Sequence, residues 1–407
     1  MSTRYGTSPW VRQVPASRVP AFPRFGGPRT ADVVVVGGGL TGCAAAYLCA
    51  TAGLDTVLLE RARVGQGQSG RGAGLLTPDP GPTFRDVAAA HGLRSARHVF
   101  DSWRRGALDG AALLRRLRVT CELEPRDTLV PARREDEKIL RREHDARRAA
   151  GLDAAWLTDR QLRARMRLDA PAALKLRDGF ALDPYRACLG LASAAARAGA
   201  ACFERSPVRR VRFTRRHADV LADGGTIRTG KVIVATGSAT AEFKALQRHF
   251  TRREAYVVMT GPMPAAMRRQ LGDPGMVLAD LHAPPRRVRW SGGDGDRLII
   301  TGGDQPETPE RTRDDAVVQR TNELMYELLK MYPAIFGLRP EYGWDAGYGK
   351  TADGLMYIGA HRNFPHQLFA LGGGASGVTG AFVAARLLLR AVQGTPEKAD
   401  EVFSWTR

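Results

Sequence analysis

The clearest pattern in the chain is a set of short apolar runs and Ala-rich stretches near the N-terminus. Residues 33–36 are four consecutive valines, which is typical of a strand buried on both faces. Residues 40–52 are rich in alanine and favour a helix, and residues 56–59 predict a second buried strand. Strand, helix and strand in this order predict a parallel β-α-β unit.

The same criteria predict elements along the rest of the chain. Asp183 is expected to cap a helix in which Pro184 takes the first position, and Asp223-Gly224-Gly225 is expected to form a hairpin turn. Helices are predicted at 84–118, 135–150, 184–198, 317–332 and 381–392. Strands are predicted at 127–131, 174–182, 201–203, 208–214, 218–221, 226–228, 231–235, 253–260, 286–290 and 297–301.

The first thirty residues differ from this pattern. They contain several prolines, which disfavour a helix, so we predict an extended arm. Trp10, Phe22 and Phe25 are candidates to pin the arm to the body of the protein, and wrapping of a partner subunit is an equal alternative.

Three glycines follow the valine run. Gly37, Gly39 and Gly42 have G-x-G-x-x-G spacing, and Glu60 closes the second strand about twenty residues later. In this context the first glycine permits a tight turn, the second lets the backbone approach a pyrophosphate, and the third lets the helix lie close to the sheet. The helix start offers free N–H groups to the diphosphate, and Glu60 can accept hydrogen bonds from a ribose. The motif predicts a dinucleotide site.

Charge changes this picture little. The net charge is +19, and most of the cations are arginines spread along the whole chain. We interpret this as a coding bias, with a functional basic surface as the alternative. The pairs at 133–134, 141–142 and 147–148 are expected on a solvated helix face. Nucleic acid is therefore not expected as a partner.

Five cysteines stand apart, without C-x-x-C pairs or a His cluster. We expect no metal site and no disulfide framework, as in a reducing cytoplasm. No apolar run reaches the ~20 residues that span a bilayer, and the N-terminus lacks the apolar core of a signal peptide. A cytoplasmic protein is therefore predicted.

Four blocks together resemble one family. These are VVVVGGGLTG with LLE; GQSGRGAGLL; SPVRRV with KVIVATG; and TADGLMYIG with LFALGGGASGVTGAF. Their order and spacing is similar to that of the D-amino acid oxidase-like FAD-dependent oxidoreductases, above all the glycine oxidase, sarcosine oxidase and gamma-glutamylputrescine oxidase branches. The resemblance covers residues 10–394. The chain departs from the usual pattern at Gly72, where relatives carry Asn, and in the last glycine loop, which lacks a His.

The resemblance implies an α/β fold. A Rossmann-type FAD-binding domain would be interrupted by an α+β substrate domain with a mainly antiparallel sheet. We predict the FAD-binding domain at 31–77, 183–250 and 345–407, the substrate domain at 78–182 and 251–344, and the arm at 1–30.

The resemblance also implies cofactor contacts. The predicted FAD-binding residues are Gly37, Gly38, Gly39, Leu40, Thr41, Gly42, Glu60, Arg61, Ser69, Gly70, Arg71, Ala73, Gly74, Leu75, Val208, Ala235, Thr236, Gly237, Gly359, Gly372, Gly374, Ser376, Gly377, Val378 and Thr379. The final helix would point its N-terminus at the flavin ring and stabilise the reduced anion. No Cys lies in 350–380 and no His lies between the first glycine blocks and His91, so FAD is predicted to be non-covalent.

The implied reaction is oxidation of a C–N bond in an amine or amino acid. A hydride would pass to flavin N5, and the resulting imine would hydrolyse. O₂ is the expected acceptor and H₂O₂ the product. Candidate catalytic residues are Arg289 for a substrate carboxylate, Tyr256 for a hydrogen bond, Trp344 beside the flavin and Lys350 for oxygen activation. A surface position for Arg289 and a core position for Tyr256 are the alternatives.

Three other functions stay open. A dehydrogenase would pass electrons to a quinone or a protein. An RNA-associated flavoprotein is suggested by the net charge, and a flavoprotein without turnover is the last alternative. Neither the amine nor the oligomeric state is predicted.

Overall fold

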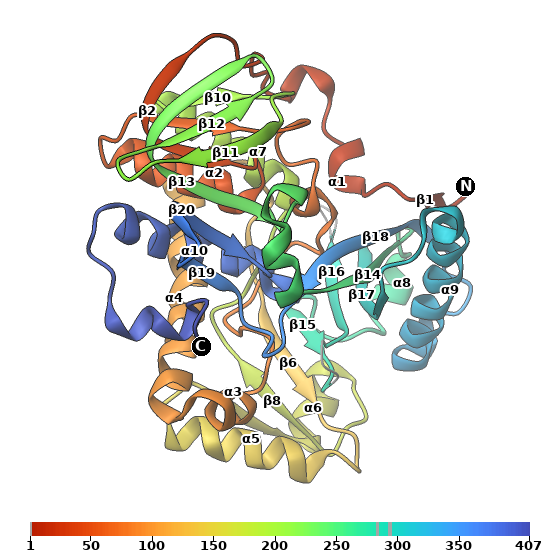
Figure 1. Ribbon diagram of the computed structural model, residues 1–407. Coiled ribbons are helices and arrows are strands. Elements are labelled where there is room, and N and C mark those ends of the chain that lie inside the picture. The colour runs from red at the N-terminus through yellow and green to blue at the C-terminus, as the bar shows by residue number, and fades with distance from the viewer. Residues whose placement is uncertain (1, 282–284, 292–294) are drawn as a thin grey trace.

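Two large β-sheets organise the chain (Figure 1) in a computed structural model that describes residues 2–281, 285–291 and 295–407. The first, which we call the parallel sheet, contains four parallel pairs, β10/β3, β3/β2, β2/β13 and β13/β20. The hairpin β11–β12 and strand β19 extend it with antiparallel pairs. Its strands are β10 (Ala201–Phe203), β3 (Thr56–Leu59), β2 (Arg29–Val36), β13 (Gly225–Gly237), β20 (Phe364–Leu371), β19 (Tyr357–His361), β12 (Ala218–Ala222) and β11 (Val208–Phe213).

Helices cover one face of the parallel sheet. Helix α2 (Leu40–Thr51) packs between α7 (Pro184–Arg197) and α10 (Gly377–Val392), and α4 (Leu93–Arg116) packs on α10. Alanines and cysteines on α2 are almost fully buried there, which allows close helix–helix contact. On the opposite face, Phe243 of η3 (Ala241–His249) and Trp405 of the C-terminal segment complete a second core.

The second sheet, which we call the mixed sheet, has nine strands and lies beside the first (Figure 1). Helix α9 (Arg313–Met331) covers one face of the mixed sheet. We call the opposite face of the mixed sheet the inner face, because its residues share a core with helices α2, α4 and α10. In order its strands are β1 (Arg4–Tyr5), β18 (Pro340–Lys350), β14 (Thr251–Thr260), β17 (Arg297–Pro306), β16 (Arg287–Ser291), β15 (Met276–Ala279), β6 (Asp127–Pro131), β8 (Ala172–Leu176) and β7 (Ala155–Thr158).

The remaining elements connect these layers. They are α1 (Pro9–Arg12), η1 (Ala16–Arg18), η2 (Gln68–Arg71), β4 (Leu75–Leu76), α3 (Phe84–His91), β5 (Glu124–Pro125), α5 (Glu137–Ala149), α6 (Asp159–Met166), β9 (Phe180–Ala181), α8 (Ala265–Arg268), η4 (Glu310–Thr312), η5 (Pro333–Ile335), η6 (Gly374–Ser376) and η7 (Lys398–Phe403). Among the described residues, no helix has the length and apolar character needed to cross a bilayer.

The predicted α/β fold is confirmed, with several corrections to its elements. The helix expected at 84–118 is two helices, because Gly92 at φ +81° breaks it. The strands expected at 226–228 and 231–235 are one continuous strand, β13, since it pairs with β2 on both sides of Gly230. Helix α10 begins at Gly377, four residues before the predicted start. The division into FAD-binding and substrate domains remains a prediction.

The N-terminal arm was predicted to be extended. It is not extended throughout, because Pro9 starts a one-turn helix. Proline is compatible with the first position of a helix, where its missing N–H has no partner to lose. The arm packs on its own chain. Trp10 and Phe25 are buried, and Phe22 is half-buried against the core.

The prediction that the arginines of α5 lie on a solvated face is wrong for one of them. Arg147 is buried and donates hydrogen bonds to Glu143 and Asp79, and its guanidinium lies 4.8 Å from the ring centre of Phe100. Burial opposes the charge, but the two carboxylates still raise its pKa. The charge pattern along α5 did not reveal this buried ion pair because Asp79 is distant in sequence.

Asp183 caps α7 as predicted. Its carboxylate accepts hydrogen bonds from the N–H groups of Tyr185 and Arg186. Burial nevertheless raises its pKa from 3.8 to about 6, against the effects of those bonds and of the Arg186 charge. The cap is therefore satisfied in geometry but carries a desolvated charge at neutral pH.

This pKa has a consequence for stability. Since the folded pKa lies above the unfolded one, the stabilisation is complete below about pH 4 and is lost as pH rises through about 6, a change of about 3 kcal/mol. Asp183→Asn keeps a cap acceptor and removes the titration. We expect the unfolding free energy of the variant relative to the wild type to rise by about 2–3 kcal/mol between pH 4.5 and about pH 8. Urea unfolding at both pH values measures it, and parallel pH profiles would contradict it.

Candidate active site

The first glycine loop connects β2 to α2 at the carboxyl end of the parallel sheet. Gly37 has φ +109°, and a Cβ there would lie 2.6 Å from the carbonyl oxygen of Ala235. A Cβ on Gly42 would lie 1.8 Å from the carbonyl oxygen of Gly37. Both positions require glycine, one for its backbone conformation and both for close packing. The predicted roles of a tight turn and of close helix–sheet packing therefore have a geometric basis.

Glu60 lies against this loop. Its carboxylate accepts hydrogen bonds from the N–H of Gly38 at 2.7 Å and from the N–H of Ala62 at 2.8 Å. The carbonyl of Glu60 accepts from the N–H of Ser206, so the segment that leads into Val208 runs beside it. Ser69 accepts from the N–H of Leu40 at 2.9 Å, which places the next loop at the start of α2. Arg61, in contrast, is solvent-exposed.

The loop of residues 69–75 is fastened from several sides. Trp344 donates to the carbonyl of Arg71 at 2.7 Å, and Trp10 of the arm donates to the carbonyl of Gly72 at 2.9 Å. The guanidinium of Arg71 is itself bound to the carbonyl and carboxylate of Asp345, at 2.8 and 2.6 Å. Burial favours the neutral form of Asp345, but the hydrogen bond from Arg313 and the two arginine charges lower its pKa. The loop is therefore held in position by hydrogen bonds from the arm and from the mixed sheet.

Arg289 is buried at 5% exposure, so the alternative of a surface arginine is wrong. Its guanidinium donates to the carbonyls of Ala73, Leu182 and Trp290, at 2.8, 3.4 and 3.2 Å. Burial lowers its pKa to about 10. The predicted contact of Arg289 with a substrate carboxylate stays a prediction, while its contacts with the 69–75 loop support a structural role.

These contacts give a testable expectation. Arg289→Met removes the guanidinium that donates to three carbonyls, so we expect a loss of about 3 kcal/mol in the free energy of unfolding. Arg289→Lys should recover part of it, because an ammonium reaches fewer carbonyls. Urea unfolding of both variants measures the loss. Unchanged stability together with a raised KM for carboxylate-bearing substrates would instead support substrate binding.

The C-terminal glycine loop, residues 372–376, leads into α10. Two hydroxyls attach the loop and the start of α10 to the segment after β4: Ser376 donates to the carbonyl of Pro80, and Thr379 donates to the carbonyl of Thr77 at 2.7 Å. A Cβ on Gly372, at φ +84°, would lie 2.7 Å from Thr351. Gly359 is predicted in the same site but lies on β19 opposite Phe369, where a Cβ would face open space.

A tyrosine and a carboxylate face this loop from the mixed sheet. The hydroxyl of Tyr348 donates a hydrogen bond to Asp304, and a Cβ on Gly374 would lie 3.9 Å from the Tyr348 ring. Burial raises the pKa of Asp304, although the hydrogen bond from Tyr348 and the Arg253 and Lys350 charges oppose this. Burial and the bond to Asp304 raise the pKa of Tyr348. Asp304 is therefore poised to take up a proton more readily than an exposed carboxylate.

Three of the four predicted catalytic residues share the inner face of the mixed sheet. Trp344 and Lys350 lie at alternate positions of β18, with Tyr348 between them, and Arg289 lies on the same face of β16. Tyr256 points to the opposite face, into the core under α9. Its hydroxyl is bound there by Glu254, Gln305 and Thr308. This geometry supports the core alternative for Tyr256.

Four residues near the site were not predicted. They are Tyr348, Asp304, Thr351 and Gln68, the last of which packs on Gly237. Tyr348 and Thr351 belong to the block YGWDAGYGKTADG that suggested Trp344 and Lys350, so their position carried a signal. Asp304 follows Gly302 and Gly303, both at positive φ, which mark an irregular strand but no chemistry.

A family model described as FAD dependent oxidoreductase (DAO) matches residues 32–391. The chain belongs to this family. Gamma-glutamylputrescine oxidoreductase of Escherichia coli (strain K12) is 24% identical to it over 385 residues, which cover 91% of this chain and 85% of that protein. Glycine oxidase of Bacillus licheniformis is 24% identical over 391 residues, or 91% and 95% of the two chains. The predicted resemblance is thereby confirmed.

The fold agrees with this family. The crystal structure of glycine oxidase from Geobacillus kaustophilus superposes with a TM-score of 0.78 at 22% identity, and covers 93% of this chain and 99% of that one. The chain is an FAD-dependent oxidoreductase.

The geometry of the described residues also fits FAD, independently of the comparison with relatives. The first glycine loop leaves no room for a Cβ at Gly37 or Gly42, and Glu60 lies beside it. At the other end of the site, the buried hydroxyl of Thr351 next to Gly372 has no hydrogen-bond partner among the described residues. A cofactor with a diphosphate at one end and a polar ring at the other matches this arrangement.

Proposed function

We propose that the chain oxidises a C–N bond of an amine or amino acid, with O₂ as the final acceptor. When bound, FAD would supply a hydride acceptor at N5 and the redox group for two-electron reduction of O₂ to H₂O₂. The substrate would lose a hydride from carbon and a proton from nitrogen, and water would then hydrolyse the imine to a carbonyl compound and a free amine or ammonia. The relatives named for gamma-glutamylputrescine and glycine support this chemistry.

The pair of Tyr348 and Asp304 carries the proposal. An amine arrives as an ammonium ion and must lose a proton before its carbon can release hydride. The Asp304 carboxylate, with its raised pKa, would accept that proton, and the Tyr348 hydroxyl would orient the nitrogen beside Gly374. Both side chains are half-buried, which limits their contact with water and strengthens both contacts.

Three further features support the reaction. The N-terminus of α10 carries no acidic residue in its first turn, so its positive dipole end is available to a developing anion. Lys350 forms no ion pair with a described residue and stands at the end of β18, which agrees with the predicted role in oxygen activation. Trp344 fixes the 69–75 loop through its hydrogen bond to Arg71.

Non-covalent attachment of FAD is part of the proposal. All five cysteines are free thiols and buried, and Cys43 and Cys188 both contact the carbonyl of Gly38 from behind the first glycine loop. The hydrogen bond between the thiols of Cys43 and Cys188, together with burial, raises the pKa of Cys43, so it is a poor nucleophile. Acid precipitation of the yellow protein should leave the colour in the supernatant. A yellow pellet would contradict this.

The proposed reaction is tested by mixing the FAD-loaded protein with a panel of amines and amino acids under nitrogen and then admitting air. We expect one class of compound to bleach the oxidised flavin and air to restore its colour with release of H₂O₂. Bleaching that air does not reverse would favour a dehydrogenase. No bleaching by any amine would overturn C–N oxidation.

A further inference from the structure

A second concave site lies away from the glycine loops, on the outer side of α7. It is a cavity of about 440 Å³ bounded by the N-terminal arm, the end of α4 and α7. A volume of this size is typical of sites that hold a small molecule, which run from roughly 300 to 1,000 Å³. None of its lining residues belongs to the predicted FAD or catalytic set.

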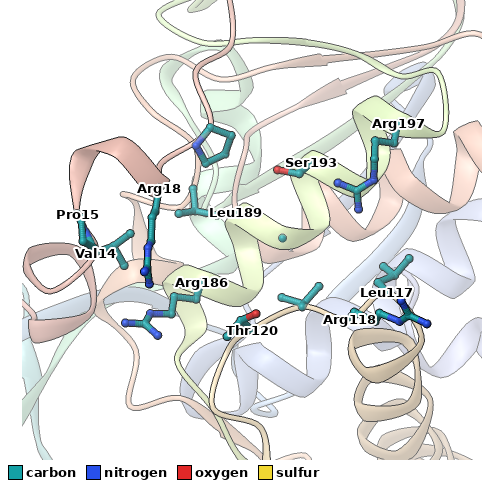
Figure 2. A pocket seen from close by; sticks show the side chains of 13 residues that line it. Val14, Pro15, Arg18, Leu117, Arg118, Thr120, Arg186, Leu189, Ser193 and Arg197 are labelled. Atoms are coloured by element: carbon teal, nitrogen blue, oxygen red, sulfur yellow. The ribbon is translucent and has the colours of Figure 1, made fainter.

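Four arginines from three separate segments line this cavity (Figure 2). Arg18 of the arm and Arg186 stand at one end, and Arg118 and Arg197 stand at the other. Arg186 and Arg197 come from the same helix, three turns apart, and Ser193 lies between them. Thr120 adds a second hydroxyl. The cavity therefore offers guanidinium groups at both ends and hydroxyls in the middle.

The positive charge of this cavity is only partly compensated. Arg186 lies 3.4 Å from Glu122 and 3.2 Å from Asp183. In the part of the chain that the structure describes, Arg18, Arg118 and Arg197 form no ion pair. Like charges gathered without counter-charges repel one another, so an anion bound between them would relieve that repulsion. Planar guanidinium groups bind phosphate and carboxylate oxygens in a bidentate way.

The backbone at Arg118 gives an independent indication. Arg118, two residues after the end of α4, has φ +54°, and the N–H of Val119 bonds back to the carbonyl of Leu114. Glycine is the usual residue in this helix-ending motif, because other residues are strained there. The chain instead carries an arginine whose side chain lines the cavity.

We propose that this cavity binds a small polyanion with two or more phosphate or carboxylate groups, spaced to reach both pairs of arginines. Phosphate and carboxylate share the chemistry that the guanidinium groups recognise, and the test separates them. The size of the cavity and the placement of charge at its two ends favour such a molecule over a nucleic acid strand.

The test is isothermal titration of the FAD-loaded protein, so that the dinucleotide site is filled. The probes are pyrophosphate, tripolyphosphate, citrate and an RNA oligonucleotide in 0.15 M NaCl. We expect one saturable site, and the preferred probe tells phosphate from carboxylate. Arg118→Gly removes a guanidinium and relieves backbone strain, so affinity should fall at least tenfold while Tm stays the same or rises. Arg197→Gln should weaken binding in the same way.

The matched control is Arg205→Gly. Arg205 is also an exposed arginine at positive φ, +50°, but does not line the cavity. Its replacement should leave the affinity unchanged. Three results would overturn the proposal: no saturable binding of any probe up to about 10 mM, equal weakening by Arg205→Gly, or binding only of an RNA oligonucleotide at several sites per chain. A general effect of positive charge would produce the last two.

Discussion

An alanine at position 42 is expected to leave the protein without bound FAD. The new Cβ would lie 1.8 Å from the carbonyl oxygen of Gly37 and 3.4 Å from Val35, so α2 must move away from β2. That movement opens the turn on which the diphosphate depends. Overpacking of this kind costs about 1–3 kcal/mol and occasionally more. FAD content after purification, read from the ratio of visible to ultraviolet absorbance, measures the effect.

A matched control lies at the other end of the same helix. Gly53 has φ +83°, and nothing lies within 4 Å of a Cβ placed there. Gly53→Ala should cost only backbone strain, of order 1 kcal/mol, and should keep FAD. If Gly42→Ala does not fold, Glu60→Gln replaces it as the test, because it disturbs only one carboxylate. We expect Glu60→Gln to weaken FAD binding about tenfold or more. Full FAD content in both Gly42→Ala and Glu60→Gln would contradict the predicted cofactor site.

Tyr348→Phe and Asp304→Asn are each expected to lower kcat/KM by about 10²–10³-fold, because general base catalysis contributes on that scale. Phenylalanine retains the ring against Gly374 and loses only the hydroxyl that orients the amine. Asparagine retains an acceptor and loses the base. The two losses should not add in the double variant, since both groups act on one proton. Steady-state kinetics on the substrate found by bleaching measures them.

Tyr256→Phe is the control for these variants. Tyr256 also lies in the mixed sheet and is fully buried, but its hydroxyl binds Glu254 and Gln305 on the face under α9. Loss of that hydroxyl should cost about 1 kcal/mol of stability and leave kcat within about twofold. A large loss of kcat in Tyr256→Phe, with none in Tyr348→Phe, would restore Tyr256 as the catalytic tyrosine and remove Tyr348.

The parts of the fold that are local in sequence were predictable. Strand β3 has the predicted bounds, and β2 ends and α2 begins where the valine run and the glycines indicate, because burial on both faces and the turn glycines leave their own pattern. The cap at Asp183 followed from the same local chemistry. The order of the motif blocks then sufficed to predict the cofactor and the family.

Features that depend on distant partners were not predictable. The burial of Arg147 depends on Asp79, and Asp304 becomes significant only because β17 brings it to Tyr348 of β18. The side of the sheet on which Tyr256 lies depends on the register of β14 with β18, which one residue of shift would reverse. Continuity of β13 through Gly230 required the pairing with β2.

Anaerobic titration of the FAD-loaded protein with the amines and amino acids of the panel tests the central claim most directly. The account predicts that at least one amine class reduces the flavin, seen as loss of its visible absorbance, and that Tyr348→Phe slows this reduction about 100-fold or more while Tyr256→Phe does not. A flavin that a chemical reductant bleaches but no amine does would contradict the proposed reaction. Equal rates in all three proteins would contradict the proposed site.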